Sequence, residues 1–163
     1  DRVRTTDLDL GIIVFLLVNK AEGTIDRIAL SNTEQAAGTV KMSEKPFKEI
    51  KVPIGYEGNL IAKAIATGQP QKTTDFKYLF APALSPRAAR FNQAGGGIEF
   101  SYVCPLKARE GGALIFSFYQ DHTRIEGRHY AFAQKYAKLV DQYLGKRAKL
   151  QDRELPAGKD RHL

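Results

Sequence analysis

Cysteine and long apolar runs are both scarce in this sequence. Cys104 is the only cysteine among 163 residues, so an internal disulfide and a zinc site made of four cysteines are both excluded. The longest apolar run, Ile12–Val18, is far shorter than the roughly 18–20 residues of a membrane-spanning helix. It also lacks the basic flank and small-residue cleavage site of a signal peptide. We therefore expect a cytoplasmic segment that makes no membrane contact of its own.

The composition is that of an ordinary globular domain. Hydrophobic residues make up 43% of the chain and charged residues 26%, which excludes a disordered, collagen-like or disulfide-built chain. The length corresponds to about one domain with a sizeable core. The sequence starts abruptly at Asp1 and ends in a polar stretch, so we expect it to be part of a longer protein.

Positive charge gathers in the second half of the chain. The formal net charge is +7, yet residues 1–75 carry equal numbers of cations and anions. The clearest basic cluster consists of Lys146, Arg147, Lys149 and Arg153. Such a cluster can bind nucleic acid or another acidic partner, or it can be the solvated end of a helix. We favour the helix end and expect no nucleic-acid partner, because no aromatic residues interleave with the cluster as stacking platforms.

The first half of the chain predicts three strands. Gly11–Asn19 is β-branched and apolar, typical of a central buried strand, and a short glycine-containing connection leads to a partner strand over 24–31. Residues 32–47 are polar and mixed, which indicates a loop with at most a short helical turn. Alternation over 49–54 predicts a half-exposed strand, which Pro53 places near an edge or an end.

A helix and a long irregular crossover are expected next. After Gly55–Gly58, the apolar positions Leu60, Ile61, Ala64 and Ile65 share one helical face, and Gly68 with Pro70 ends the helix. Residues 76–97 contain aromatics, two prolines and a glycine triplet, which indicates a long connection that is functional or mobile.

The remaining residues predict two strands and a final helix. Residues 98–106 alternate, and 113–119 form the return strand. Thr123 and Glu126 fit a capping box for a helix that runs to about Lys149, and residues 149–163 are expected to be a linker or disordered tail. The predicted fold class is α+β, with a mostly antiparallel five- to six-stranded sheet flanked by helices.

Several segments, taken in order, resemble a GAF domain over residues 11–148, and we expect residues 1–10 to be a truncated or short leader. The resemblance is carried by the opening hairpin, a glycine-rich turn with its short helix, and two strands that precede the last helix. These segments are Ile12–Val18 with Thr24–Leu30, Val52–Gly58 with Leu60–Ile65, Thr67–Pro70 with Thr74-Asp75, Phe100–Leu106 and Gly112–Phe118. The chain departs from the family at its start: only residues 1–10 precede the first strand, so we expect the long helix that usually opens such a domain to be short or missing.

The resemblance implies a GAF/PAS-like sensor of a small molecule or of redox state. Such a module often dimerises and regulates the output domain of a larger signalling protein. The family's pocket lies between the sheet and the crossover, so the resemblance places Phe76, Tyr78, Leu79 and Phe80 on its lid. Its floor would include Phe100, Tyr102, Phe116 and Phe118, and Arg87 in the crossover could meet an anionic group. The alternative is that each aromatic fills the core and that Arg87 is solvated surface.

The sequence gives little support for a catalytic site or a bound cofactor. Cys104 lies within a predicted strand, the wrong segment for attaching a bilin, and a single cysteine argues against the methionine-sulfoxide-reductase branch of the family. His122, His129 and His162 show no metal-ligand spacing, and no nucleophilic triad or phosphate loop is present. We expect no enzyme activity, no metal and no cofactor, while a cyclic nucleotide stays open as a ligand.

Two functions fit these features. In the first, a small molecule enters the pocket and the last helix passes the change onward. In the second, the chain is a ligand-free interaction module whose last helix pairs two copies. The apolar positions of that helix exceed a single stripe, which predicts a second contact and favours a homodimer through the terminal helix. Nucleic-acid binding by the basic end is a third and weaker hypothesis.

Overall fold

The sheet of this protein has six strands, all paired antiparallel, in the order β3-β2-β1-β6-β5-β4. The structure is a computed structural model that describes residues 8–154. The strands are β1 (Leu10–Asn19), β2 (Thr24–Leu30), β3 (Val52–Pro53), β4 (Gln71–Thr73), β5 (Phe100–Leu106) and β6 (Gly112–Phe118). This arrangement confirms the predicted α+β fold with a mostly antiparallel sheet.

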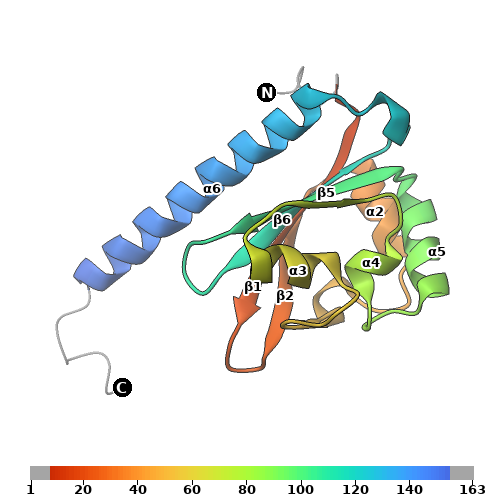
Figure 1. The fold of residues 1–163 in the computed structure, drawn as a ribbon. Helices are drawn as coiled ribbons and strands as arrows, with labels where there is room; N and C mark the ends of the chain where they lie inside the picture. The colour runs from red at the N-terminus through yellow and green to blue at the C-terminus, as the bar shows by residue number, and fades with distance from the viewer. Residues whose placement is uncertain (1–7, 155–163) are drawn as a thin grey trace.

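Helices cover both faces of the sheet, as Figure 1 shows. The long helix α6 (Gly127–Glu154) crosses one face, which we term the α6 face. The other face, which we term the pocket face, carries four shorter helices. They are α2 (Glu34–Lys41), α3 (Leu60–Thr67), α4 (Lys77–Phe80) and α5 (Pro86–Gly96), and two 3-10 turns are η1 (Phe47–Glu49) and η2 (His122–Arg124). Each face has its own apolar core.

The short helices begin and end where their caps allow. In α3 the Asn59 Oδ1 accepts from the backbone N–H groups of Ile61 and Ala62 at 2.8 and 3.2 Å, and Gly68 ends the helix in the left-handed conformation. Helix α5 starts with Ser85 as its N-cap and Pro86 in its first turn. The prediction of a helix over 60–67 is confirmed.

Two segments expected to be irregular are helices instead. The predicted loop over 32–47 contains α2, capped by Thr33, and the predicted crossover over 76–97 contains α4 and α5. Glycine explains the difference. A Cβ on Gly38 would collide with the backbone of Gly95, and a Cβ on Gly95 would collide with that of Gly38. These glycines let α2 and α5 touch through their backbones, whereas composition alone indicated flexibility.

The edges of three other elements also differ from expectation. The strand expected over 49–54 is reduced to Val52–Pro53, and Gln71–Thr73 adds the edge strand β4. Thr123 does not cap the last helix: it lies within η2, where the Asp121 carboxylate accepts from its N–H at 3.0 Å, and α6 begins only at Gly127. Helix α6 continues to Glu154, beyond the expected end near Lys149. The leader residues 1–7 and the tail residues 155–163 lie outside the described residues.

Candidate functional site

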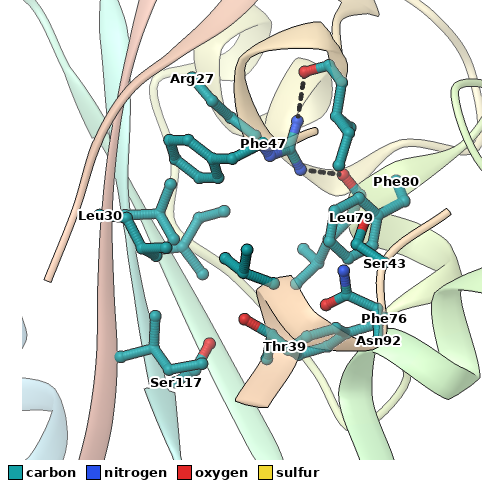
Figure 2. A pocket seen from close by; sticks show the side chains of 15 residues that line it. Arg27, Leu30, Thr39, Ser43, Phe47, Phe76, Leu79, Phe80, Asn92 and Ser117 are labelled. Carbon is teal, nitrogen blue, oxygen red and sulfur yellow. Dashed lines mark hydrogen bonds between the residues drawn. The ribbon is translucent and has the colours of Figure 1, made fainter. Parts of the chain in front are cut away.

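A small cavity lies on the pocket face, between the sheet and helices α2, α4 and α5 (Figure 2). Its volume is about 40 Å³, enough for a few heavy atoms. Its walls are mostly aliphatic and aromatic, with a few polar side chains among them. The lining residues are Ile12, Val14, Arg27, Leu30, Thr39, Val40, Ser43, Phe47, Ile50, Phe76, Leu79, Phe80, Asn92, Ile115 and Ser117.

Arg27 is the charged residue of this cavity, and it is only 3% exposed. Its Nη1 donates to the Ile50 carbonyl at 3.1 Å and its Nη2 to the Leu79 carbonyl at 3.2 Å. The guanidinium carbon lies 4.6 Å from the centre of the Phe80 ring, a cation–π distance. Burial lowers the pKa of Arg27 to about 9, so the side chain is still cationic at neutral pH.

Three further polar side chains line the cavity. The Thr39 hydroxyl donates to the Ala36 carbonyl at 2.7 Å, and the Ser117 hydroxyl is hydrogen-bonded to that of Ser101 at 2.7 Å. Asn92 is 4% exposed, and none of the described residues forms a hydrogen bond with its side-chain amide. In Figure 2, Arg27 lies at one end of the ring of lining side chains, and Thr39, Asn92 and Ser117 lie toward the other.

Three of the four residues expected on the lid line the cavity. Phe76, Leu79 and Phe80 are buried and belong to its wall, and the Phe76 and Phe80 rings lie 5.6 Å apart. Tyr78 does not line it. It is 42% exposed and its ring lies beneath the Lys77 ammonium instead.

Arg87 also lies outside the cavity, so the structure does not support its expected contact with an anionic group of a ligand there. It is exposed on α5, where its guanidinium carbon lies 5.7 Å from the centre of the Phe91 ring. The neighbouring Arg90 is likewise exposed and lies 4.0 Å from an Asp75 carboxylate oxygen. The cation of this site comes from β2 rather than from the crossover.

The aromatic floor expected from β5 and β6 is on the opposite side of the sheet. Phe100, Tyr102, Phe116 and Phe118 pack on the α6 face. The cavity floor comes instead from Ile12 and Val14 of β1 and from Ile115 and Ser117 of β6. The alternation along both strands was correct, but every residue of β6 is buried, so alternation could not tell which face meets the pocket.

Arg27 and Asn92 are the site residues that sequence reasoning missed. A signal for Arg27 was present, because it lies two residues after Ile25 on β2 and therefore on the same face as that buried side chain. Asn92 was harder to predict from the sequence. It falls on a buried helical side only if residues 86–96 are recognised as a helix with Ala88 and Ala89 on that same side.

The α6 face is filled by edge-to-face aromatic pairs. Tyr130 lies 4.9 Å from Tyr102 and 6.1 Å from Phe100 between ring centres, and Tyr136 lies 5.6 Å from Phe116. The Asp141 carboxylate accepts from the backbone N–H groups of Lys107 and Ala108 at 3.0 and 2.7 Å. These contacts fix α6 to the sheet and to the β5–β6 turn.

The outer side of α6 keeps apolar side chains in solvent. Leu139 is 57% exposed and Tyr143 60% exposed. The described cations of the basic cluster, Lys146, Arg147 and Lys149, are exposed near the end of the same helix; the side chain of Arg153 is outside the described part. None of the helices within residues 8–154 combines the length and apolar character that a membrane crossing requires.

Titratable side chains outside the cavity offer little reactive chemistry. Cys104 is buried against α6, and burial raises the pKa of its thiol to about 12. His129 is buried at the start of α6, where Glu126 donates its N–H to Nδ1 at 3.0 Å. Across the described residues, no group of three His, Cys, Asp or Glu side chains is arranged to hold a metal ion.

Searches with family models and among curated proteins find no match, whereas solved structures provide several. The GAF domain of a two-component sensor histidine kinase from Bacillus halodurans has a TM-score of 0.60 at 16% identity, over 93% of this chain and 92% of that one. The GAF domain of a phosphoenolpyruvate-protein phosphotransferase from Coxiella burnetii has a TM-score of 0.59 at 14% identity, over 91% and 78%.

An enzyme is among the similar structures as well. Free methionine-R-sulfoxide reductase from Neisseria meningitidis, solved with its substrate, has a TM-score of 0.54 at 14% identity, over 90% of this chain and 75% of that one. At such identities the likeness concerns the fold, and a fold does not determine a function. The order of strands, the helices on both faces and these structural relatives together show that the chain has the GAF fold.

Proposed function

We propose that this chain is the sensory module of a larger signalling protein and that it binds a small molecule in the cavity of the pocket face. The observation that carries the proposal is the cavity itself, which has apolar walls, a buried cation and an amide without a partner among the described residues. Apolar enclosure with a few convergent polar groups is the usual character of a ligand site. The sensor-kinase GAF domain with the same fold supports the regulatory role.

Strand β6 offers a direct route from the cavity to α6. Ile115 and Ser117 line the cavity, while Phe116 between them packs on Tyr136 of α6. A shift of this strand therefore moves residues on both faces of the sheet at once. We propose that ligand binding changes the position of α6 in this way and that α6 passes the change to an output domain.

The segments that enclose the cavity are tied together by a few hydrogen bonds. Gln93 of α5 donates to the carbonyls of Thr74 and Ile98 and accepts from the Phe76 N–H, at 2.8, 2.9 and 2.9 Å. Arg27 links the carbonyl of Ile50 with that of Leu79. A ligand that displaces or reorients either group would alter several segments together, as a switch requires.

The proposed role is binding rather than catalysis. The Cys104 thiol, with its pKa raised to about 12 by burial, stays protonated at neutral pH and is a poor nucleophile. It also lies on the α6 face, on the other side of the sheet from the cavity. The chain therefore has no second cysteine and no exposed thiolate with which to follow the reductase chemistry of its structural relative.

The first test is thermal denaturation of the purified chain against a panel of nucleotides, cyclic nucleotides, amino acids and small organic acids. A ligand at about 100 times its Kd stabilises a protein by about 2.7 kcal/mol, which corresponds to several degrees in Tm. Val14→Ile places one more methylene in the cavity and should reduce the shift. Val18→Ile makes the same change on β1 outside the cavity and should leave it unchanged.

The alternative is a dimerisation module, favoured by the exposed apolar side of α6. Two copies could bury Leu139 and Tyr143 against each other. Leu139→Lys should then convert the dimer to a monomer in analytical ultracentrifugation, while Lys138→Ala on the same helix should not. No shift from any compound, together with a Tm that rises with protein concentration, would favour this alternative over the sensor. A monomer at all concentrations that responds to a compound would do the reverse.

A further inference from the structure

Arg27 has no anionic partner among the described residues, and this absence has a cost. None of the described carboxylates forms an ion pair with its guanidinium, which contacts two carbonyls and one aromatic ring. A charge removed from water is stabilised chiefly by an opposite charge with good hydrogen bonds. Carbonyl dipoles and a ring face compensate only part of that loss, so the cavity keeps a net attraction for an anion.

The contacts of Arg27 fix the position of its side chain but do not use all of its N–H donors. Hydrogen bonds to Ile50 and Leu79 fix the plane of the guanidinium, which has further N–H groups beyond the two that these bonds use. A planar, fixed guanidinium matches the two oxygens of a carboxylate. Figure 2 shows this group at the end of the cavity, between Phe47 and Leu79.

Asn92 contributes a second polar side chain to the wall of the cavity. Its side chain is buried on α5, lines the cavity and forms no hydrogen bond within the described residues. No fully buried side-chain nitrogen or oxygen of the described residues lacks a hydrogen-bond partner, so the Asn92 amide is not fully enclosed and stays accessible from the cavity.

The size and walls of the cavity restrict the ligand further. The volume of about 40 Å³ is well below the roughly 150 Å³ that holds a benzene ring, so a nucleotide does not fit without a large rearrangement. Between the polar groups the walls are aliphatic, with Val14, Leu30 and Ile115 among them. A small ligand with one anionic end and a short apolar body suits these walls.

We propose that the cavity binds a short-chain monocarboxylate, whose carboxylate pairs with Arg27 and whose alkyl part contacts Val14 and Ile115. This assignment rests on the proposed sensory function and specifies its ligand class. The cation selects an anion, the aliphatic walls select a carboxylate over an inorganic oxyanion, and the volume selects a short chain.

The test is a titration of the ¹⁵N-labelled chain followed by two-dimensional NMR at constant ionic strength. Acetate, propionate and butyrate are compared with acetamide and propionamide, which have similar shapes without the charge, and with nitrate and chloride. We expect saturable shifts around residues 27, 79 and 92 for the carboxylates, and binding at least about tenfold weaker for the amides. Equal affinity for acids and amides, or equal affinity for every anion, would overturn the proposal.

Variants separate a binding role from a structural one. Arg27→Gln should raise the Kd for propionate at least about tenfold, while Arg90→Gln, on the exposed side of α5, should leave it unchanged. If Arg27 serves only to hold the segments around Ile50 and Leu79, Arg27→Gln will weaken acids and amides alike and leave the ratio of their affinities unchanged, and the proposal fails.

Failure of the ligand assignment and failure of the sensory function give different results. If Arg27→Gln does not fold, the ratio of acid to amide affinity in the unmodified chain still decides. If carboxylates fail to bind but another compound class stabilises the chain and is blocked by Val14→Ile, the sensory function stands and the carboxylate assignment falls. If no compound of any class binds, the sensory function falls as well.

Discussion

The two faces of the sheet are built on different principles, although the same strands supply both. On the α6 face, aromatic rings from β5, β6 and α6 meet edge to face and leave α6 closely fitted. On the pocket face, four short helices cover a cavity whose cation pairs with no described carboxylate. Aromatic packing maximises contact, whereas a cavity and an unpaired charge reduce stability and are tolerated where a ligand compensates. One face is therefore suited to holding a helix and the other to admitting a small molecule.

Phe116→Ala should have the largest effect on stability, because it removes the ring at the centre of the α6 face. Phe116 is fully buried between β6 and α6 and contacts Phe132 and Tyr136. Removing a buried aromatic ring costs about 3–5 kcal/mol, which urea denaturation measures directly. The matched change on the pocket face is Ile115→Val, at the preceding residue of the strand, for which about 0.5–1.5 kcal/mol is expected.

The outcome at Phe116 can also break the comparison. If Phe116→Ala costs no more than Ile115→Val, the aromatic contacts do not hold α6, and transmission through β6 loses its physical basis. Hydrogen exchange offers a second readout, because amides in the first half of α6 should lose protection in Phe116→Ala while those of α2 and α5 should keep theirs.

Gly38→Ala tests how the pocket face is assembled. A Cβ at this position would collide with the backbone of Gly95, so α2 and α5 would have to separate. Overpacking of this kind costs about 1–3 kcal/mol. Gly145→Ala is the control, because Gly145 lies within α6 with no heavy atom near the added methyl, and there alanine should stabilise by about 0.5–1 kcal/mol.

If Gly38→Ala lowers the stability while Gly145→Ala raises it, then contact between helices, and not helix propensity, determines the effect at position 38. Gly38→Ala should also weaken the binding of any compound in the cavity, since Thr39 and Asn92 lie on the two helices that separate. A Gly38→Ala variant as stable as the unmodified chain would mean that α2 and α5 have room between them.

These glycines also show where sequence reasoning succeeds and where it fails on this chain. The long strands and α6 are set by runs of apolar residues with clear periods, so their existence follows from the sequence. Helices α2 and α5 depend on backbone contact between Gly38 and Gly95, and a residue without a side chain carries no periodic signal. Prediction from local sequence patterns therefore misses helices whose stability comes from tertiary contacts.

Prediction of the candidate site failed at a different step. Phe100 and Phe116 were correctly placed on one side of their strands, yet both sides of β6 are buried, and nothing local distinguishes them. The assignment of faces depends on where the helices pack, which is set by the whole topology. Arg27 was detectable as a charge on the face of Ile25, but its isolation from every described carboxylate is visible only in three dimensions.

The smallest expected effect is a dependence of stability on pH that belongs to the α6 face. His129 packs on Phe118 with its Nε2 2.9 Å from Gln120 Oε1, and its Nδ1 accepts from the Glu126 N–H. Burial, assisted by Arg128, lowers the pKa of His129 below the ordinary histidine value of 6.5. The unfolded chain therefore takes up this proton at a higher pH than the folded chain, and folding loses stability as pH falls from about 6.5 toward the folded pKa.

His129→Gln should flatten this part of the stability profile, measured by urea denaturation from neutral to mildly acidic pH. His122→Gln is the control, because His122 is exposed in η2, and the variant should retain the loss of stability on acidification. The Arg27 side chain stays charged throughout this range, since its pKa of about 9 lies well above it. Acidification in this window should therefore loosen the start of α6 without discharging the guanidinium of the pocket, which separates the two faces experimentally. An unchanged profile in His129→Gln would assign the acid sensitivity to other groups and leave the faces indistinguishable by pH.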